Sequence, residues 1–420
     1  MNTIKIAIIG IGYVGLPLAL EFGKIFKTIG FDKNKNRIKN LNRYLDDNKE
    51  FSPNEIKKSK KLKFTINQSD IKNCNIYIIT VPTPIYKNKK PDLRNLINAT
   101  KFTASLLKKN DIIIYESTVY PGVTDEKCIP ILESISKLKC NKDFYCGYSP
   151  ERINPGDKKN QLKNISKIVS GSNKIALDKI FYLYSKIINK KIVKVSSIRI
   201  AEAAKIIENT QRDINIAFMN ELTQIFNAMN LNTEEILKAA SSKWNFINFK
   251  PGFVGGHCIS VDPYYLSYKS KQIGIEPKMI LSGRKINDEM HKYVFKKLKH
   301  NLSGKNISNL NVLILGYTFK ENCSDYRNTK IRDLYKLLEN NFKKVEVFDP
   351  LIINKNIYKE KINFIKQLYK QKYDIILVAV AHDRFKNIGI TKIKSFLKNK
   401  DSILFDLKYL FNEEETSIRL

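Results

Sequence analysis

Residues 4–20 read IKIAIIGIGYVGLPLAL, an apolar run that meets three glycines and then continues as a helix-like segment. Gly10, Gly12 and Gly15 match the pattern GxGxxG, which alone is a weak signal. Here the glycines follow a predicted strand, and Asp32 ends the next predicted strand. This order is typical of the first βαβ unit of a dinucleotide-binding domain. The stretch therefore predicts an α/β fold with a doubly wound parallel sheet.

Each glycine of this turn has a physical reason to be there. Gly10 makes the tight turn, Gly12 lets the backbone approach a pyrophosphate at the positive helix N-terminus, and Gly15 allows close helix–strand packing. Asp32 would accept hydrogen bonds from a ribose and repel a 2′-phosphate, which favours NAD over NADP. The nearby cations that weaken this preference are Lys33, Lys35 and Arg37. The predicted cofactor contacts here are Gly10, Gly12, Tyr13, Val14, Gly15, Asp32 and Arg37, and the alternative is a turn that binds nothing.

The length and composition predict a folded protein of two or three domains. The 420 residues are too many for one ordinary core, and a hydrophobic share of 43% argues against disorder. Lys and Arg total 74 against 41 acidic residues, so the net charge is +33, which would suit a nucleic-acid binder. The lysines are scattered through every segment, without a basic tail or an RNA-binding signature, so we expect no nucleic-acid partner. Codon drift explains this charge better, with some attraction of anionic small molecules.

The cysteines and the N-terminal segment bear on the compartment. The six cysteines include no CxxC pair, which argues against a disulfide framework or a metal site and fits a reducing compartment. The uncharged residues 6–20 imitate the core of a signal peptide. Three glycines and Pro17 interrupt them, and they are shorter than the ~20 residues of a membrane span. We therefore expect a soluble, cytoplasmic protein without membrane association.

Two α/β regions are predicted, with a helical connector between them. Neither Pro nor Gly occurs from about residue 198 to 230, and apolar residues recur at helical spacing, which predicts one long helix. A loop-rich stretch over about 241–265 and a helical segment over 276–300 follow. The predicted strands are 4–9, 28–31, 76–81, 111–115, 166–169, 310–316, 344–349, 375–381 and 402–407. The predicted domains are an NAD-binding Rossmann domain (1–197), a central helical connector (198–300) and a second Rossmann-like domain (301–420). An apolar face on such a connector favours a homodimer or higher homo-oligomer, although packing on its own domain is an equal alternative.

The second α/β region lacks the dinucleotide pattern. Its first strand ends in LGYTFKENCSDYR (315–327), with Gly316 as its one glycine. Lys320 and Arg327 in this stretch suit phosphate or carboxylate contacts, although either cation alone is more often a solvated surface charge. Both α/β regions look like nucleotide-binding domains, but only the first carries the dinucleotide pattern. This difference suggests that the first domain binds NAD and the second binds a different nucleotide.

The most unusual local sequence surrounds a cysteine. Residues 252–263 read GFVGGHCISVDP, in which glycines precede Cys258 and Asp262 follows it. A thiolate is a strong nucleophile, glycines let backbone N–H groups approach a reacting centre, and a carboxylate can anchor a lysine or a water. The alternative for a lone cysteine is a small buried apolar residue. His257 as a metal ligand is disfavoured because no second ligand lies at a useful spacing.

The long predicted helix supplies two polar candidates. Lys205 and Asn209 lie four residues apart and therefore on one helical face, where together they could hold an oxyanion. The alternative is an exposed lysine beside a surface amide.

Seven stretches follow one another along the chain: GIGYVGLPLA (10–19), TVPTP (80–84), ESTVYPG (116–122), YSPERINPGD (148–157), AEAAKIIENTQRD (201–213), PGFVGGHCISVDPYYL (251–266) and LGYTFKENCSDYRNT (315–329). In these stretches the chain resembles the UDP-glucose/GDP-mannose dehydrogenase family over nearly its full length. The VGGHC form and the SPERINPGD run are similar to the Vi-polysaccharide-type dehydrogenases that act at C6 of UDP-N-acetylglucosamine or UDP-N-acetylgalactosamine. Val261 stands where relatives specific for UDP-glucose carry a lysine, which puts one cofactor contact in doubt and agrees with the N-acetyl branch.

The resemblance implies an NAD-dependent four-electron oxidation of the sugar C6 hydroxyl to a carboxylate, for capsule or surface polysaccharide synthesis. It implies that Cys258 is the nucleophile, which carries a thiohemiacetal and then a thioester, and that Glu151 is the general base for hydrolysis. The other implied catalytic residues are Lys205 and Asn209 for negative charge, Asp262 for orienting lysine and water, and Thr118 for holding a water. Further implied cofactor contacts are Thr83, Thr118 and Arg327. The implied contacts with the UDP-sugar are Glu151, Arg152, Lys205, Asn209, Gly255 and Lys320.

Several alternatives stay open on the sequence. The substrate could instead be UDP-glucose or UDP-N-acetylmannosamine, because motifs do not fix the few contacts that choose a sugar. A two-electron NAD enzyme of the hydroxyacid type would share the first domain, but it needs neither a glycine-flanked cysteine nor a second nucleotide domain. It would yield one NADH per substrate rather than two. A nucleotide sensor or a nucleic-acid binder without catalysis is the third alternative.

Overall fold

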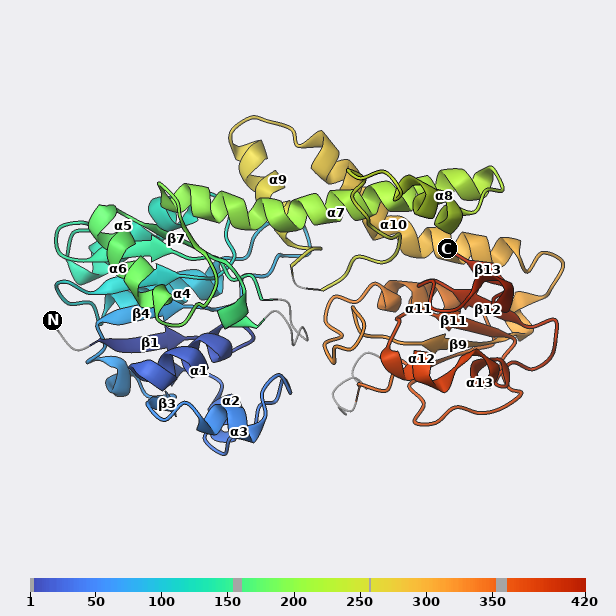
Figure 1. Cartoon of the computed structure of the whole chain (residues 1–420), viewed down its shortest axis with the longest axis horizontal. Helices are drawn as coiled ribbons and strands as arrows, with labels where there is room; N and C mark the ends of the chain where they lie inside the picture. Colours follow the sequence, from blue (N-terminus) through green and yellow to red (C-terminus); the bar gives the residue numbers. More distant parts are fainter. Residues whose placement is uncertain (1–3, 154–160, 257, 353–360) are drawn as a thin grey trace. The chain divides into compact units, whose positions relative to one another are not determined.

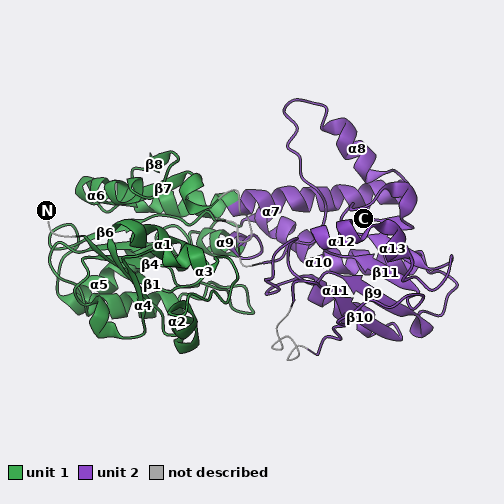
Figure 2. Cartoon of the chain, turned by 60° about the horizontal axis from the view of Figure 1, so that its bottom comes forward, with its two compact units in different colours: residues 1–208, 264–276 green, residues 209–263, 277–420 purple. Residues whose placement is uncertain are grey.

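The computed structural model describes residues 4–153, 161–256, 258–352 and 361–420. The chain divides into two compact units, coloured separately in Figure 2. Unit 1 comprises residues 1–208 and 264–276, and unit 2 comprises residues 209–263 and 277–420. The predicted α/β class with two Rossmann-like sheets and a long helix is confirmed. The predicted three-part division at residues 197 and 300 stays a prediction.

Unit 1 is built on one sheet with the strand order β3-β2-β1-β4-β5-β6-β7-β8 in the part of the chain that the structure describes. Neighbouring strands are parallel except β6 and β7, which pair antiparallel over two residue pairs. The strands are β1 (Lys5–Ile9), β2 (Lys27–Phe31), β3 (Leu62–Thr65), β4 (Ile76–Ile79), β5 (Ile112–Tyr115), β6 (Tyr145–Tyr148), β7 (Lys167–Gly171) and β8 (Ile192–Lys194). The helices are α1 (Gly15–Ile25), α2 (Lys35–Leu41), α3 (Pro53–Lys57), α4 (Arg94–Ala104), α5 (Ile129–Ser136) and α6 (Lys174–Ser185) (Figure 1).

Apolar residues on both faces of the strands explain why helices cover the unit 1 sheet on two sides. Side chains alternate along a strand, so Ile6 and Ile8 of β1 share one core cluster with residues of α1 and α6. On β5, the buried hydroxyl of Tyr115 lies 3.1 Å from that of Thr100 on α4. A sheet buried on both faces needs nearly continuous apolar strands, as IYII in β4 and IIIY in β5 show.

The long helix α7 (Ile198–Ala228) confirms the prediction from the segment without Pro or Gly. Near its start, the buried Glu202 accepts hydrogen bonds from the backbone N–H groups of Gly122 (2.6 Å) and Thr124 (3.0 Å). Burial raises the pKa of Glu202 to about 7, against the effect of these hydrogen bonds. The boundary between the two units falls within α7, after residue 208.

Unit 2 carries a second parallel sheet, with the order β10-β9-β11-β12-β13 among the described residues. Alternate residues of β9 again divide between two cores: Val312 and Ile314 pack with α10 and α11, whereas Leu313 and Leu315 pack with α12 and α13. The strands are β9 (Asn311–Leu315), β10 (Lys344–Phe348), β11 (Ile375–Val378), β12 (Ile403–Asp406) and β13 (Ile418–Arg419). The helices are α8 (Thr233–Ala240), α10 (Lys278–His300), α11 (Ile331–Glu339), α12 (Asp383–Ile388) and α13 (Ile390–Lys394).

The predicted loop-rich stretch over about 241–265 is too long at its end. Helix α9 (Asp262–Gln272) begins within this stretch. The backbone carbonyl of Cys258 accepts the N–H of Asp262 at 2.8 Å, which is the first hydrogen bond of the helix. The apolar residues 6–20 form a strand, a turn and a helix, as predicted. Among the described residues, no helix combines the length and the hydropathy that crossing a membrane requires.

Candidate active site

The first group of predicted residues follows the strands at the centre of the unit 1 sheet. From β1 the strand order runs to β2 and β3 on one side and to β4 and β5 on the other. Such a reversal leaves a crevice beyond the carboxyl ends of the strands, where open α/β sheets bind ligands. The glycine turn follows β1, and residues 80–83 follow β4. The unit 1 sheet thus brings Gly10–Gly15 and Thr83 to the same edge.

The geometry of the three glycines fits a bound pyrophosphate. Gly10 has φ +98°, a conformation that L side chains rarely adopt. A Cβ atom on Gly15 would lie 1.9 Å from the Gly10 carbonyl oxygen, so no side chain fits between the turn and α1. A Cβ atom on Gly12 would meet nothing within 4 Å. In the described part of the chain, the absence of a side chain at Gly12 therefore serves no packing need, and it leaves room for a ligand. Tyr13 and Val14 are half-buried in the same turn.

Asp32 and Arg37 both hold the glycine turn. One carboxylate oxygen of Asp32 accepts the N–H of Ile11 at 2.8 Å, and the other accepts the N–H of Asn34 at 2.9 Å. Arg37 is buried, and its Nε donates to the Ile11 carbonyl at 3.0 Å while Nη1 donates to Asp46 at 2.6 Å. Its Nη2 atom has no hydrogen-bond partner among the described residues. Arg37 thus braces the turn from inside the protein, which the sequence reading did not foresee.

Thr83 and Thr118 are brought together in unit 1. The hydroxyl group of Thr83 donates to the Thr118 carbonyl at 2.6 Å. The buried Tyr265 of α9 donates its hydroxyl to the Thr83 carbonyl at 2.9 Å. Tyr265 was not among the predicted residues, although it lies in the motif PYYL that follows Asp262.

Glu151 and Arg152 follow β6 and point to different partners. Glu151 is 8% exposed, and its Oε1 accepts the N–H groups of Arg152 and Ile153, each at 2.5 Å. The Arg152 guanidinium forms an ion pair with Glu208 of α7 at 2.7 Å. Residues 154–157 of the predicted SPERINPGD motif lie outside the described residues.

A second group gathers around the cysteine in unit 2. Cys258 is exposed, in the turn whose carbonyl group receives the first N–H of α9. Asp262 is buried and accepts the side-chain amide of Asn209 at 2.5 Å. Unit 2 therefore joins the turn of the predicted nucleophile to two predicted polar residues. Lys205 lies one helical turn before Asn209 on α7 and is buried. His257 lies outside the described residues.

The glycine pair before Cys258 packs on the loop that carries the predicted nucleotide contacts. A Cβ atom on Gly255 would lie 2.8 Å from the Asn328 carbonyl oxygen, and the N–H of Gly256 donates to that oxygen at 3.3 Å. Arg327 in this loop forms an ion pair with Asp325 at 2.7 Å. Lys320 lies in the same loop, with its ammonium 5.9 Å from the centre of the Phe319 ring.

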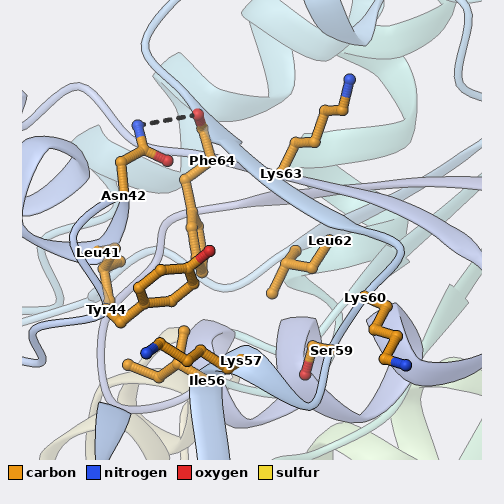
Figure 3. Close-up of a pocket in the computed structure, with 10 residues that line it drawn as sticks. All are labelled: Leu41, Asn42, Tyr44, Ile56, Lys57, Ser59, Lys60, Leu62, Lys63 and Phe64. Carbon is orange, nitrogen blue, oxygen red and sulfur yellow. Dashed lines mark hydrogen bonds between the residues drawn. The ribbon is translucent and has the colours of Figure 1, made fainter. Parts of the chain in front are cut away.

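Among the described residues, neither a metal-binding cluster nor the cavity drawn in Figure 3 belongs to these groups. The described residues contain no cluster of three or more His, Cys, Asp or Glu side chains able to hold a metal ion. A cavity of about 320 Å³ in unit 1 lies between α2, α3 and β3 (Figure 3). None of its lining residues is a predicted site residue: Leu41, Asn42, Tyr44, Ile56, Lys57, Ser59, Lys60, Leu62, Lys63 and Phe64.

Comparison with known proteins shows the family. Residues 4–188, 199–289 and 313–413 match the NAD binding, central and UDP binding domains of the UDP-glucose/GDP-mannose dehydrogenase family. The UDP-N-acetyl-D-glucosamine 6-dehydrogenase of Salmonella typhi is 51% identical, with 100% of this chain and 99% of the relative covered. The enzyme of the same name from Pseudomonas aeruginosa is 48% identical, with both chains covered in full.

A solved structure gives the same result for the fold. The UDP-D-ManNAc dehydrogenase from Pyrococcus horikoshii superposes with a TM-score of 0.89 at 28% identity, covering 99% of this chain and 98% of that chain. The sequence motifs, the matched domains and the full-length relatives agree, and this chain belongs to the UDP-glucose/GDP-mannose dehydrogenase family.

Proposed function

We propose that this chain oxidises the C6 hydroxyl group of a UDP-N-acetylhexosamine to a carboxylate, as an NAD-dependent dehydrogenase. The names of the Salmonella and Pseudomonas relatives make UDP-N-acetylglucosamine the first candidate substrate, and UDP-N-acetylgalactosamine is the second. Val261 supports the N-acetyl branch of the family. The uronate product would feed the synthesis of a capsule or another surface polysaccharide.

The overall reaction converts R–CH2OH, two NAD and one water into R–COO⁻, two NADH and three protons. Bound NAD would accept the hydride in each oxidation, held by the Gly10–Gly15 turn, Asp32, Thr83, Thr118 and Arg327. Arg37 would support that site through the Ile11 carbonyl. Gly255, Arg152 and Lys320 would hold the UDP-sugar.

Cys258 would carry the covalent intermediates. Its thiolate adds to the C6 aldehyde and forms a C–S bond, and oxidation of this thiohemiacetal leaves a thioester. Glu151 then takes a proton from a water (held by Thr118) as the water attacks the thioester carbonyl, and the C–S bond breaks to release the uronate. Lys205 and Asn209 would stabilise the oxyanion that forms at each stage. The hydrogen bond from Asn209 to Asp262 supports this assignment, because it fixes the amide beside the turn of Cys258.

The observation that carries the proposal is the exposed Cys258, whose carbonyl accepts the N–H of Asp262, while the side chain of Asp262 accepts the amide of Asn209 on α7. The experiment measures NADH formed per UDP-sugar consumed, over a panel of N-acetylglucosamine, N-acetylgalactosamine, N-acetylmannosamine and glucose derivatives. We expect two NADH per sugar and the highest kcat/KM with UDP-N-acetylglucosamine. A yield of one NADH would instead support a two-electron hydroxyacid-type enzyme.

The variant Cys258→Ala tests covalent catalysis directly. It should abolish uronate formation, while NAD affinity measured by calorimetry stays within about twofold, because the proposed cofactor contacts of the glycine turn lie in unit 1. Cys323→Ala, which removes a buried thiol of unit 2, is the matched control and should keep turnover. Steady-state turnover above a few per cent in Cys258→Ala would contradict the covalent mechanism.

The proposal also includes the assembly, the domains and the compartment. We propose a homodimer, because exposed apolar side chains of α7 in unit 2, including Phe218 and Ile225, offer a face for a second copy. The three domains proposed are 1–197 for NAD, 198–300 as connector and 301–420 for the UDP-sugar. We propose the cytoplasm as the compartment, since a cysteine that acts as a nucleophile must stay reduced and the cytosol keeps thiols reduced.

A further inference from the structure

A buried cluster of charges in unit 1 lies behind Glu151 and contains residues that the sequence did not single out. Lys167, the first residue of β7, is 2% exposed. Its ammonium group donates to Glu116 at 2.6 Å and to the Pro150 carbonyl at 2.9 Å, and it lies 3.5 Å from Oε2 of Glu151. The other oxygen of Glu116 accepts the hydroxyl group of the buried Tyr184. Three acceptors thus face the three donors of one ammonium.

The two carboxylates do not share this ammonium equally. Glu116 takes the short contact, whereas Glu151 stands at the limit of hydrogen-bond distance. Burial raises the pKa of Glu116 to about 7, although Lys167 acts in the opposite direction. An ammonium group that is buried away from water needs partners that compensate for its lost hydration, and Glu116, the Pro150 carbonyl and Glu151 are these partners of Lys167.

The contacts of Lys167 fix both sides of the proposed base. Its bond to the Pro150 carbonyl holds the peptide group that precedes Glu151. Its charge faces Oε2, while the backbone N–H groups of Arg152 and Ile153 hold Oε1. The carboxylate is therefore oriented from two directions, and Glu116 keeps the ammonium from closing a tight ion pair with it.

We propose that Lys167, balanced by Glu116, is a positioning residue that orients Glu151 and keeps it available to accept a proton from water. This inference rests on the proposed role of Glu151 in thioester hydrolysis. Neither Lys167 nor Glu116 touches the reacting atoms; both act through Glu151.

The pH profile of hydrolysis distinguishes this role from simple packing. Among the described residues, the charged and titratable groups around Glu151 are Lys167 on β7, Glu116 after β5, Tyr184 on α6, the adjacent Arg152, and Glu208 on α7. Lys167→Met leaves Glu151 beside Glu116 without a cation, so the acid limb of the hydrolysis rate should move to higher pH. Glu116→Gln removes the competing negative charge, so Glu151 becomes the one carboxylate that Lys167 contacts among the described residues. The acid limb of the hydrolysis rate should therefore move to lower pH.

The experiment mixes enzyme rapidly with excess NAD and UDP-N-acetylglucosamine and follows NADH and the Cys258 adduct over pH. Both variants should keep the NADH burst but slow hydrolysis by about 10- to 100-fold. The larger value equals the smallest rate loss expected when a general base is removed completely. Lys167→Arg should restore most of the rate. Lys194→Met is the matched control, because Lys194 on the neighbouring β8 pairs with Asp178 at the surface at 2.7 Å, and its profile should match the wild type.

The outcomes separate this inference from the proposed function. A wild-type enzyme that forms no adduct and only one NADH overturns the proposed function itself. A wild-type enzyme with an adduct and two NADH, together with unshifted acid limbs in folded Lys167→Met and Glu116→Gln, overturns only the role of Lys167. Thermal unfolding and NAD binding show whether Lys167→Met folds. If it does not, Glu116→Gln alone tests the role of Lys167, through the predicted shift of its acid limb to lower pH.

Discussion

Asp32 shows how one side chain can serve both the fold and the choice of cofactor. Its carboxylate accepts the N–H of Ile11 and so holds the glycine turn, and the same carboxylate is proposed to bind the ribose of NAD. Asp32→Asn keeps an acceptor for Ile11 but removes the charge. We expect NAD affinity to fall by about 10- to 100-fold, the value of a hydrogen bond to a charged group, and NADP discrimination to relax. Calorimetric titration with both cofactors measures this, and unchanged affinities would remove Asp32 from the site.

Glu151 is the base proposed for the last chemical step, so its variant should fail late. Glu151→Gln keeps an oxygen for the N–H groups of Arg152 and Ile153 but cannot accept a proton. Turnover should fall by ~10²–10⁴-fold, the usual contribution of a general base. Rapid mixing should still show a burst approaching two NADH per site, and intact mass should show an adduct on Cys258. Loss of the burst would mean that Glu151 serves binding or the hydride steps instead.

The sequence predicts those parts of the candidate site that consist of neighbouring residues. It does not predict contacts between residues that are far apart along the chain. Three parts of the site could be recognised because each lies within a short stretch of sequence with a characteristic spacing. These parts are the glycine turn, Asp32 at the end of the next strand, and the Cys258 segment. Lys167 and Glu116 are 51 residues apart and meet only because β5 and β7 bring them together. One signal was present: a lysine that begins an apolar run buried as a strand needs a partner.

The turn after β1 has a counterpart after β9, and the comparison explains why one of them suits a dinucleotide. Gly316 also has a positive φ, +92°, and the N–H of Tyr317 donates to Asp349 after β10 at 2.7 Å, as Ile11 donates to Asp32. Two residues after Gly316 stands Thr318, whose hydroxyl contacts the buried His382 at 3.2 Å. Burial raises the pKa of Asp349, but bonds from His382 and the backbone outweigh it and hold this pKa below its ordinary value. Thr318 of unit 2 therefore corresponds to Gly12 of unit 1, and the space that is open at Gly12 is filled there by the side chains of Thr318 and His382.

Two glycine variants separate the structural part of the β1–α1 turn from its binding part. Gly15→Ala would place Cβ 1.9 Å from the Gly10 carbonyl and 2.6 Å from the Thr80 hydroxyl, so β1 and α1 must move apart. We expect a loss of several kcal/mol, or roughly 10 °C in Tm. The new Cβ atom of Gly12→Ala meets no atom of the described residues within 4 Å, so its Tm should stay within a few degrees while NAD affinity drops at least tenfold. Calorimetry of both variants checks this, and equal effects on Tm would refute the distinction.

Long elements were easier to predict than short ones. The 31 residues of α7 followed from the absence of Pro and Gly over a long window, a signal that sums along the sequence. The strands β8 and β13, of three and two residues, carry too few alternating positions to be recognised. Helix α9 was assigned partly to a loop because DPYYLSYKSKQ has no one-sided apolar stripe.

The net charge of +33 acts on the molecule as a whole. Several lysines lie over aromatic rings, such as Lys194 over Phe181 at 4.2 Å and Lys179 over Tyr145 at 4.4 Å, contacts of about 0.5–1 kcal/mol at exposed sites. Aromatic partners of this kind help a lysine-rich chain to fold. The excess charge still repels a second copy, and salt screens this repulsion beyond about 10 Å at 0.1 M. Association of two chains must therefore come from apolar contacts and should strengthen with salt.

The apolar contacts proposed for a dimer are on α7, where Phe218 and Ile225 lie seven residues apart on one face and are both exposed. Phe218→Asp with Ile225→Asp should convert the dimer into a monomer of 48.6 kDa, because two buried carboxylates without partners cost far more than the interface gains. Thr391→Asp, at an exposed position of α13, is the control and should leave the dimer intact. Sedimentation velocity at low and high NaCl measures the mass of each protein. A wild-type monomer at micromolar concentration in high salt, or a double variant that still dimerises, would show that this face does not bind a second copy.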